Sequence, residues 1–391
     1  MMTVIYVFGT RPELIKMIPL ITESKKNAAI KTVVCSTGQH KEMLQSLYHF
    51  FELTPDIDFE LMKPDQNLVT LHAETMFRMR EVINEYKPDW VIVQGDTTSA
   101  HAAAMAAFYQ NVKVGHVEAG LRTYDIRSPF PEEMNRRAIG LVASAHFCPT
   151  ADAAKHLFQE MTDHSSYVEV TGNTGIDTLY LVDELFEKND ELANQYAENF
   201  SYLNLNRFIL ATQHRRENFG EPQEHILKAL LTVAKEHQID ILFPVHPNPH
   251  VRHAVEQILI PESNPCVTWA GSHANVERSQ PGRIFLIEPL DYPALIYAMK
   301  KCSFVMTDSG GIQEEAPTFK KEILVLRQST ERPEGVAAGF SKLVGTDYKS
   351  IVAAAGDVCN VSPARSQFGQ NPFGDGHASE RIISSLLRSS L

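Results

Sequence analysis

Acidic residues, histidines, arginines and glycines recur at one kind of position in this sequence, directly after short apolar segments. Asp96 follows one such segment and Glu118 ends another, whereas His214 and Ser309 follow two segments in the second half of the chain. Carboxylates and imidazoles can exchange protons with a bound molecule, and glycine-rich turns beside arginines can receive an anion. These residue types therefore predict acid–base chemistry on an anionic substrate.

The apolar segments are expected to be strands that place these residues together. We expect strands at 4–8, 31–35, 90–94 and 112–118, and again at 207–212, 239–245, 284–287, 303–307 and 323–326. Helical periodicity predicts helices at 12–26, from about 40, at 68–86, 99–109, 222–237, 292–301 and about 377–387, with surface helices over 183–199. Continuous apolar strands that alternate with helices indicate parallel sheets covered on both faces. Ligands bind outside the carboxyl ends of such strands, where the polar residues lie.

Two glycine-containing turns are candidates for anion binding. Gly9-Thr10-Arg11-Pro12 can leave a strand and begin a helix, so Arg11 and Lys16 could receive an anion, although such a turn also serves simply as a helix cap. Ser309, Gly310 and Gly311 allow a phosphate to approach the backbone closely. Glu315, one helical turn further on, could accept both hydroxyls of a ribose, whereas Glu314 is expected to be a solvated surface charge.

Several functional classes are disfavoured by the sequence. No strand is followed by G-x-G-x-x-G and no G-x-x-x-x-G-K-[ST] is present, so neither a dinucleotide cofactor nor a P-loop is expected. His246, His250 and His253 could suggest zinc, but Pro247 and Pro249 lie between the first two and break the helix that a zinc-binding pair would use. We therefore expect no metal and no cofactor.

Charge and composition limit which partners and which cellular compartment are expected. A formal net charge of −12 disfavours nucleic acid and membrane surfaces as partners. No apolar run approaches the ~18 residues of a membrane span, no signal peptide is recognisable, and the 5 cysteines form no C-x-x-C pair. A cytoplasmic protein is expected.

Ten sequence blocks, in order along nearly the whole chain, resemble the non-hydrolysing UDP-N-acetylglucosamine 2-epimerases. The blocks are 9–13, 94–98, 115–123, 131–133, 171–174, 214–220, 244–248, 307–317, 330–334 and 371–376. The resemblance implies an α/β fold with two Rossmann-like domains facing a central cleft, of the glycosyltransferase-B type. The implied domains are 1–172 on the sugar and acid–base side, 173–372 on the UDP side, and 373–391 as a helix returning to the first domain. It also implies a homodimer.

The implied activity is reversible C2 epimerisation of UDP-N-acetylglucosamine to UDP-N-acetylmannosamine, a precursor for surface polysaccharide. UDP leaves C1 as the C2 proton is removed, and the resulting 2-acetamidoglucal is protonated on the opposite face when UDP adds back.

The resemblance also assigns candidate roles to residues. Asp96, Glu118 and Glu132 match acid–base carboxylates, and His214 matches a histidine near the leaving diphosphate. Positions near the phosphates are matched by Arg11, Lys16, Arg215, His246, Ser309 and Gly310, and the ribose-binding carboxylate by Glu315. The residues alone do not decide which carboxylate removes the proton and which returns it. Taken locally, Asp96 could instead cap a helix and Glu132 could interact with a helix dipole.

Three departures from the family pattern are visible. Gln213 stands where glycine is common, and the segment 261–282, expected to be a surface loop, is long. Gram-positive members bind a second UDP-N-acetylglucosamine as an activator, through a motif that Gln39, His40 and Gln66 resemble. Lys41 and Asp65 depart from that motif.

Three other functions remain open at this stage. A UDP-sugar glycosyltransferase of the same fold would use the nucleotide site but would leave the three carboxylates without a role. A hydrolysing epimerase would release N-acetylmannosamine and UDP, and a UDP-sugar-binding regulator would need neither His214 nor the carboxylates.

Overall fold

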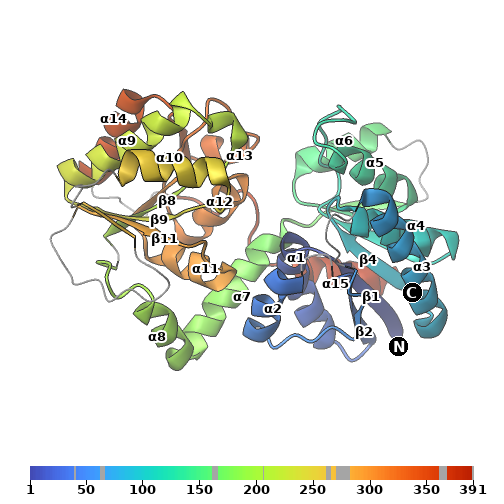
Figure 1. The fold of residues 1–391 in the computed structure, drawn as a ribbon. Helices are drawn as coiled ribbons and strands as arrows, with labels where there is room; N and C mark the ends of the chain where they lie inside the picture. The colour runs from blue at the N-terminus through green and yellow to red at the C-terminus, as the bar shows by residue number, and fades with distance from the viewer. Residues whose placement is uncertain are drawn as a thin grey trace. The chain divides into compact units, whose positions relative to one another are not determined.

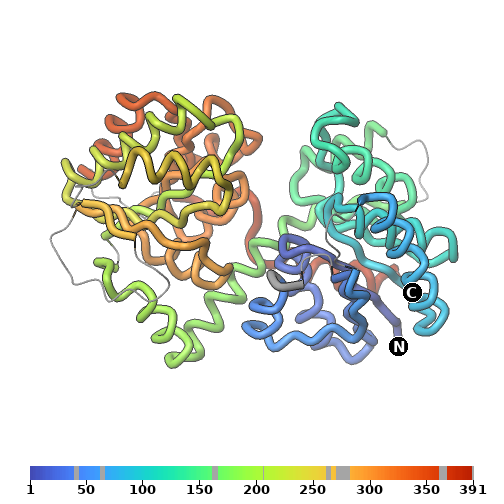
Figure 2. Tube along the Cα trace, viewed as in Figure 1, coloured from blue at the N-terminus to red at the C-terminus, as the bar shows by residue number. Residues whose placement is uncertain are grey.

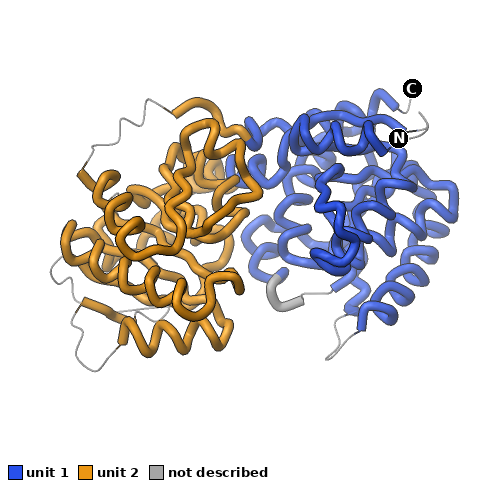
Figure 3. The backbone as a smooth tube through the Cα atoms, turned by 90° about the horizontal axis from the view of Figure 1, so that it is seen from above, with its two compact units in different colours: residues 1–181, 373–391 blue, residues 182–372 orange. Residues whose placement is uncertain are grey.

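The chain folds into two compact units, which we describe separately. The computed structural model describes residues 1–38, 41–61, 67–160, 166–205, 207–260, 266–269, 282–360 and 368–389, with only the backbone of 41–43. Unit 1 comprises Met1–Leu181 and Phe373–Leu391, and unit 2 comprises Val182–Pro372 (Figure 3). The division falls inside one helix, α7 (Thr174–Lys188).

Unit 1 contains a seven-stranded sheet in the order β3-β2-β1-β4-β5-β6-β7 (Figure 1). Its strands are β1 (Met2–Phe8), β2 (Ile30–Ser36), β3 (Ile57–Asp58), β4 (Trp90–Gln94), β5 (Lys113–Val117), β6 (Ala145–Cys148) and β7 (Tyr167–Val170). All pairings are parallel; in β1, for example, Val4 lies opposite both Thr32 and Trp90. The chain therefore reverses its direction of travel across the sheet between β1 and β4, which is the switch point of a Rossmann-like sheet.

Helices cover this sheet and complete its core. They are α1 (Arg11–Lys25), α2 (Lys41–Phe50), α3 (Leu68–Tyr86), α4 (Thr98–Tyr109), α5 (Glu132–Val142), α6 (Ala151–Glu160), the first part of α7, and α15 (Ala378–Arg388). Val7 and Val93 on one face of the sheet pack in a single cluster with Met79 of α3 and Ala103 of α4. The C-terminal α15 lies beside α1 (Figure 2), and the Arg381 guanidinium donates to the Thr171 carbonyl at 3.0 Å.

Unit 2 repeats the arrangement with a second seven-stranded sheet, ordered β10-β11-β9-β8-β12-β13-β14. Its strands are β8 (Phe208–Thr212), β9 (Asp240–Pro244), β10 (Val267–Trp269), β11 (Ile284–Ile287), β12 (Phe304–Thr307), β13 (Ile323–Val325) and β14 (Ser341–Leu343). These pairings are also all parallel, and the switch point lies between β8 and β12.

The helical elements of unit 2 include α8, which follows α7 along the chain, and several helices that cover the sheet. They are α8 (Asp190–Glu198), η1 (Arg216–Asn218), α9 (Glu221–His237), α10 (Pro249–Leu259), α11 (Tyr292–Lys301), α12 (Gly310–Glu315), η2 (Ala316–Phe319), α13 (Pro333–Ala337) and α14 (Tyr348–Asn360). Ile209 and Phe243 of the sheet share one buried cluster with Leu230 of α9 and Val255 of α10.

The α/β class with two Rossmann-like domains is confirmed. One expectation is wrong in part: within 261–282, predicted to be a loop, Val267–Trp269 form the edge strand β10, which pairs with β11. This strand has only three residues and lies among loop-forming residues, so its pattern was too short to predict a strand. Across the described residues no helix is long and apolar enough to cross a membrane.

Candidate active site

The turn after β1 is held in place by a buried carboxylate. Glu13, only 1% exposed, accepts hydrogen bonds from the backbone N–H of Gly9 (3.0 Å) and Thr10 (2.7 Å), and from the Thr10 hydroxyl (2.8 Å). The Thr97 hydroxyl, which follows β4, donates to the same carboxylate at 2.6 Å. A Cβ on Gly9 would lie 2.3 Å from the Thr37 hydroxyl oxygen, so this position requires glycine. Glu13 therefore ties together the turns on either side of the switch point.

Glu118 turns sharply away from the end of β5. Its φ of +62° is in the left-handed region, which costs a residue with a side chain about 1 kcal/mol. In this conformation its Oε2 accepts from Lys16 Nζ of α1 at 2.5 Å and from the Gln94 amide at the end of β4. The structure thus brings together two of the predicted site residues, Lys16 from α1 and Glu118 from the turn after β5.

Asp96 is fixed by an arginine that the sequence did not single out. Arg136 of α5 donates to Asp96 Oδ2 through Nε at 2.9 Å and through Nη2, and Asn135 donates to the Asp96 carbonyl at 2.9 Å. Burial raises the pKa of Asp96, the charges of Glu118 and Glu132 raise it further, and Arg136 opposes them. Glu118 and Glu132 are therefore both close enough to act on Asp96.

The two glutamates at the start of α5 have different environments. Glu133 is fully buried and accepts from the backbone N–H of Thr123 (3.0 Å) and Tyr124 (3.1 Å), so it fixes the loop before α5. The Oε2 atom of the neighbouring Glu132 is buried and has no hydrogen-bond partner among the described residues. Glu133 thus has a structural role, whereas the Glu132 Oε2 atom is not engaged in holding the described part of the fold.

His116 links the turns after β4 and β5. Its Nε2 donates to the Gly95 carbonyl at 2.7 Å, and the Gly95 N–H donates to the Val117 carbonyl at 3.0 Å. Burial lowers the pKa of His116 to about 3, so the ring is neutral at neutral pH. This neutral ring holds the backbone from which Asp96 and Glu118 project.

Unit 1 is therefore expected to lose stability in mild acid. Below pH ~6.5 the unfolded chain protonates His116 whereas the folded chain does not, so the free energy of unfolding falls by about 1.4 kcal/mol per pH unit toward pH 3. His116→Gln keeps an Nε2 donor, and we expect it to reduce this pH slope by about that amount. Urea unfolding in a Trp269→Phe background, followed by the fluorescence of the buried Trp90, measures the slope. An unchanged slope would contradict the prediction, and the slope for unit 2, followed by Trp269 fluorescence in a Trp90→Phe background, serves as the control.

In unit 2 the corresponding turns are joined by Asp308, which follows β12. It is fully buried and accepts from the backbone N–H of His214 (3.0 Å) and Arg215 (2.9 Å), and from the Asn218 amide (3.0 Å). His214 Nδ1 lies 3.1 Å from the same carboxylate. Burial alone would raise the pKa of Asp308, but the hydrogen bonds from His214 and Arg215 outweigh it and lower the pKa. Asp308 therefore orients the predicted His214 ring.

His246, which follows β9, stacks on His214. The ring centroids lie 5.7 Å apart at an interplanar angle of 24°. His246 Nδ1 accepts from the Asn248 N–H at 3.1 Å, and burial together with the neighbouring His214 lowers the pKa of His246. The structure therefore places two predicted site histidines side by side at the carboxyl edge of the sheet, with His246 favoured in its neutral form.

The Ser309-Gly310-Gly311 segment adjoins two guanidinium groups. A Cβ on Gly310 would lie 3.4 Å from Arg215 Nη2 and 3.8 Å from Arg332 Nη2, so the space over this glycine faces positive charge. The expectation for Glu314 is wrong: its side chain is only 14% exposed and accepts from Arg332 Nε. An arginine 18 residues later, beyond the reach of helical periodicity, decides its environment. Glu315 is half-buried at the end of α12.

The remaining predicted site residues are Arg11, on the surface of α1, and three residues that the structure does not describe. Arg11 is exposed in the first turn of α1. Gln39, His40 and Gln66 lie outside the described residues, so the predicted second nucleotide-sugar site stays a prediction.

Gln213, directly before His214, is only 3% exposed. Neither polar atom of its side-chain amide has a hydrogen-bond partner among the described residues. The glutamine that stands where the family commonly has glycine is therefore buried next to His214.

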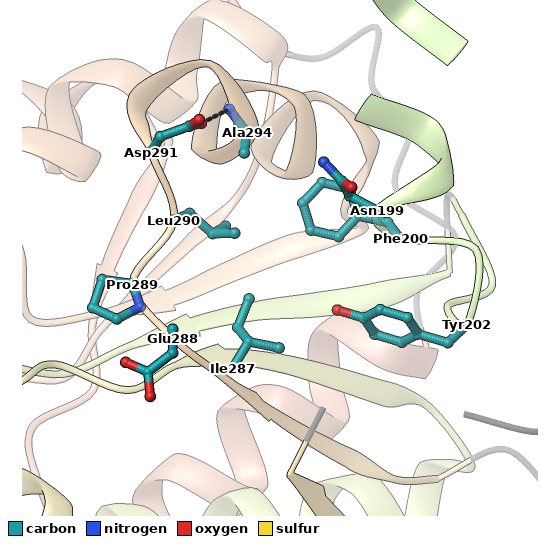
Figure 4. Close-up of a pocket in the computed structure, with 9 residues that line it drawn as sticks. All are labelled: Asn199, Phe200, Tyr202, Ile287, Glu288, Pro289, Leu290, Asp291 and Ala294. Carbon is teal, nitrogen blue, oxygen red and sulfur yellow. Dashed lines mark hydrogen bonds between the residues drawn. The ribbon is translucent and has the colours of Figure 1, made fainter. Parts of the chain in front are cut away.

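A cavity of about 160 Å³ in unit 2 carries none of the predicted site residues (Figure 4). Its lining comes from the segment after α8 and from the end of β11 to the start of α11: Asn199, Phe200, Tyr202, Ile287, Glu288, Pro289, Leu290, Asp291 and Ala294. Its two carboxylates are already engaged, since Glu288 pairs with Arg252 at 2.6 Å and Asp291 caps α11 through the Ala294 N–H at 2.8 Å. This cavity offers no acid–base group for the predicted chemistry.

Sequence reasoning missed several residues that hold the site. These are Glu13, Gln94, His116, Glu133 and Arg136 in unit 1, and Asp308, Asn218 and Arg332 in unit 2. All of them except Arg136 stand inside the quoted sequence blocks, which was the available signal. Their partners are distant in sequence, so their roles were not readable from local spacing.

Two parallel sheets, each with polar and glycine residues at its switch point, define an α/β protein of the glycosyltransferase-B class. A UDP-N-acetylglucosamine 2-epimerase family model matches residues 22–387. The chain belongs to the UDP-N-acetylglucosamine 2-epimerase family.

Relatives and solved structures agree with this assignment. The UDP-N-acetylglucosamine 2-epimerase of Campylobacter jejuni is 42% identical over 397 residues, covering 98% of this chain and 97% of that protein. The Escherichia coli UDP-N-acetylglucosamine 2-epimerase is 42% identical over 390 residues, 98% of each chain. The structure of UDP-GlcNAc 2-epimerase from Neisseria meningitidis bound to UDP-GlcNAc has a TM-score of 0.82 and 40% identity, covering 99% of this chain and 100% of that one.

Proposed function

We propose that this enzyme interconverts UDP-N-acetylglucosamine and UDP-N-acetylmannosamine by eliminating UDP and adding it back. The observation that carries the proposal is the grouping in unit 1 of Asp96, Glu118 and Glu132 at the carboxyl edge of one sheet, where the charges of both glutamates act on Asp96. The Neisseria meningitidis relative bound to UDP-GlcNAc supports the choice of substrate.

The proposed chemistry needs proton carriers and a good leaving group. A carboxylate takes the C2 proton, the C–H electrons form the C1–C2 double bond, and the C1–oxygen bond breaks so that its electron pair leaves on UDP. The return reaction protonates C2 on the opposite face as a phosphate oxygen bonds to C1 again. A base and an acid on opposite faces are therefore required.

Unit 1 offers carboxylates in two kinds of surroundings for these roles. Asp96 has a raised pKa, which favours holding a proton, although Arg136 stabilises its ionised form. Glu118 is bonded directly to the Lys16 ammonium group at 2.5 Å, so a cation of α1 holds its carboxylate in place. Glu132 contributes a buried oxygen without a hydrogen-bond partner among the described residues.

Unit 2 supplies the groups proposed to hold the leaving diphosphate. Arg215 faces the space over Gly310, and the Asp308 carboxylate orients His214 beside His246. Cations and N–H donors placed at the diphosphate stabilise the charge that develops as the C1–oxygen bond breaks. Within the same proposal, Glu315 binds the ribose hydroxyls and Arg11 approaches the phosphates.

We propose that the enzyme is a cytoplasmic homodimer and that its product supplies N-acetylmannosamine units for a surface polysaccharide. The family resemblance supports these points. Light scattering coupled to size-exclusion chromatography tests the dimer, because a mass near twice 43.9 kDa is expected and a mass near 43.9 kDa contradicts it.

Proton exchange at C2 tests the proposed reaction. Purified protein is incubated with UDP-N-acetylglucosamine in deuterium oxide, without acceptor or cofactor, and C2 is followed by NMR. We expect deuterium at C2 of both UDP-N-acetylglucosamine and UDP-N-acetylmannosamine, because the glycal intermediate is reprotonated from solvent.

The alternative functions give different products in the same experiment. Free N-acetylmannosamine with stoichiometric UDP indicates a hydrolysing epimerase. The absence of exchange, with UDP still bound by the protein, indicates a glycosyltransferase or a regulator and overturns the proposal.

A further inference from the structure

The carboxylate of Glu331 lies among three guanidinium groups without a close bond to any of them. Its Oε2 is 4.0 Å from Arg215 Nη2 and 3.9 Å from Arg332 Nη1, and its Oε1 is 3.7 Å from Arg327 Nη2. The Glu331 side chain is nevertheless 62% exposed. It therefore neutralises a cationic cluster while it remains free to be replaced there by another anion.

The other carboxylates of this cluster are held much more closely. Glu217 accepts from Arg327 Nε at 2.6 Å, and Glu314 accepts from Arg332 Nε. Arg215 differs, because Glu331 is the sole carboxylate within 4.0 Å of its guanidinium group among the described residues, and its buried Nε has no hydrogen-bond partner there. Three carboxylates thus balance three guanidinium groups, and Glu331 is the loosely bound one.

The backbone around Glu331 is fixed on both sides. The Thr330 hydroxyl donates to Gln313 Oε1 at 2.6 Å and accepts from the Arg332 N–H at 3.1 Å, while Arg332 Nη1 donates to the Glu331 carbonyl at 3.2 Å. The side chain can therefore turn toward solvent by rotamer changes alone. Two of its three cationic neighbours, Arg215 and Arg332, also border the space over Gly310.

We infer that Glu331 is an internal competitor of the diphosphate: it neutralises the guanidinium cluster in the free enzyme and is displaced when the nucleotide binds. This inference rests on the proposed function, because it takes the ligand to be a uridine diphosphate. Displacement costs binding energy, so Glu331 weakens nucleotide affinity, most strongly for the ligand with the highest negative charge. Free UDP carries more charge than UDP-sugar, so Glu331 keeps the cleaved nucleotide from binding too tightly to react again.

Calorimetric titration of the intact protein with UDP tests this role. We expect Glu331→Gln to lower the Kd for UDP about three- to tenfold at low ionic strength, because one unit of competing charge is removed near the phosphates. The effect should shrink below about twofold at ~0.5 M salt, which screens charges over a few ångströms. Uridine, which has no phosphate, is the neutral probe, and its Kd should not change.

The control is Glu256→Gln, which removes the same charge from an exposed position on α10. We expect it to leave the Kd for UDP unchanged. An unchanged or higher Kd for UDP in Glu331→Gln overturns the inference, as does equal tightening for UDP and uridine. If the wild-type protein does not bind UDP at all, the proposed function itself fails, which separates the two conclusions.

Discussion

Replacing Asp96 with asparagine is expected to slow C2 proton exchange by about 10²- to 10⁴-fold, the usual contribution of a positioned acid or base. Asparagine keeps the size of the side chain and can still accept from Arg136, which donates to Asp96 through Nε at 2.9 Å, so the fold should persist. Because the diphosphate is proposed to bind unit 2, the Kd for UDP should change less than about twofold. Deuterium incorporation measured by NMR gives the rate, and calorimetry gives the Kd.

Two further variants sharpen this prediction. Asp152→Asn changes the same residue type at a site that is 66% exposed in unit 1, and exchange should remain at the wild-type rate. Glu118→Gln removes the negative charge that pairs with Lys16 and is expected to slow exchange by a similar factor. Wild-type exchange rates in both Asp96→Asn and Glu118→Gln would remove these carboxylates from the proposed mechanism.

Replacing Asp308 with asparagine is expected to destabilise unit 2 by about 3 kcal/mol and to slow the reaction strongly. All the described groups that contact its carboxylate can act as hydrogen donors, and an amide would place an N–H₂ group against some of them. Urea unfolding followed by Trp269 fluorescence, in a Trp90→Phe background, measures the loss in unit 2, since the chain has 2 tryptophans and one lies in each unit.

The pH dependence of the Asp308 variant provides a second measurement. Because the folded pKa of Asp308 is lowered, its carboxylate contributes stability above the ordinary aspartate pKa near ~4, and this contribution is lost as pH falls through the folded pKa. The variant should lose this acid dependence in unit 2.

Asp291→Asn is the matched control for Asp308→Asn in the same unit. Asparagine also caps helices well, so α11 should lose less than about 0.5 kcal/mol. Equal unfolding midpoints for Asp308→Asn and wild type would show that Asp308 does not hold the His214 turn.

The sequence by itself determined the alternation of strands and helices and the edge at which the polar residues gather. The strands at 90–94 and 284–287 are found with the predicted bounds, because continuous apolar segments bounded by polar turns are a local signal. The strands Ile57–Asp58 and Ala145–Cys148 were missed, because the first has only two residues and the second is interrupted by His146, so neither is a continuous apolar segment.

Only the tertiary structure decided which side chains meet. Lys16 and Glu118 are 102 positions apart, and His214 and Asp308 are 94 apart, so no local pattern could pair them. Glu314 and Glu331 are both glutamates near Arg332, yet one is closely bonded and the other is loosely shared among three guanidinium groups. Their difference follows from packing and from the placement of distant arginines, because a charged side chain takes its energy from all charges within a few ångströms, whatever their separation in sequence.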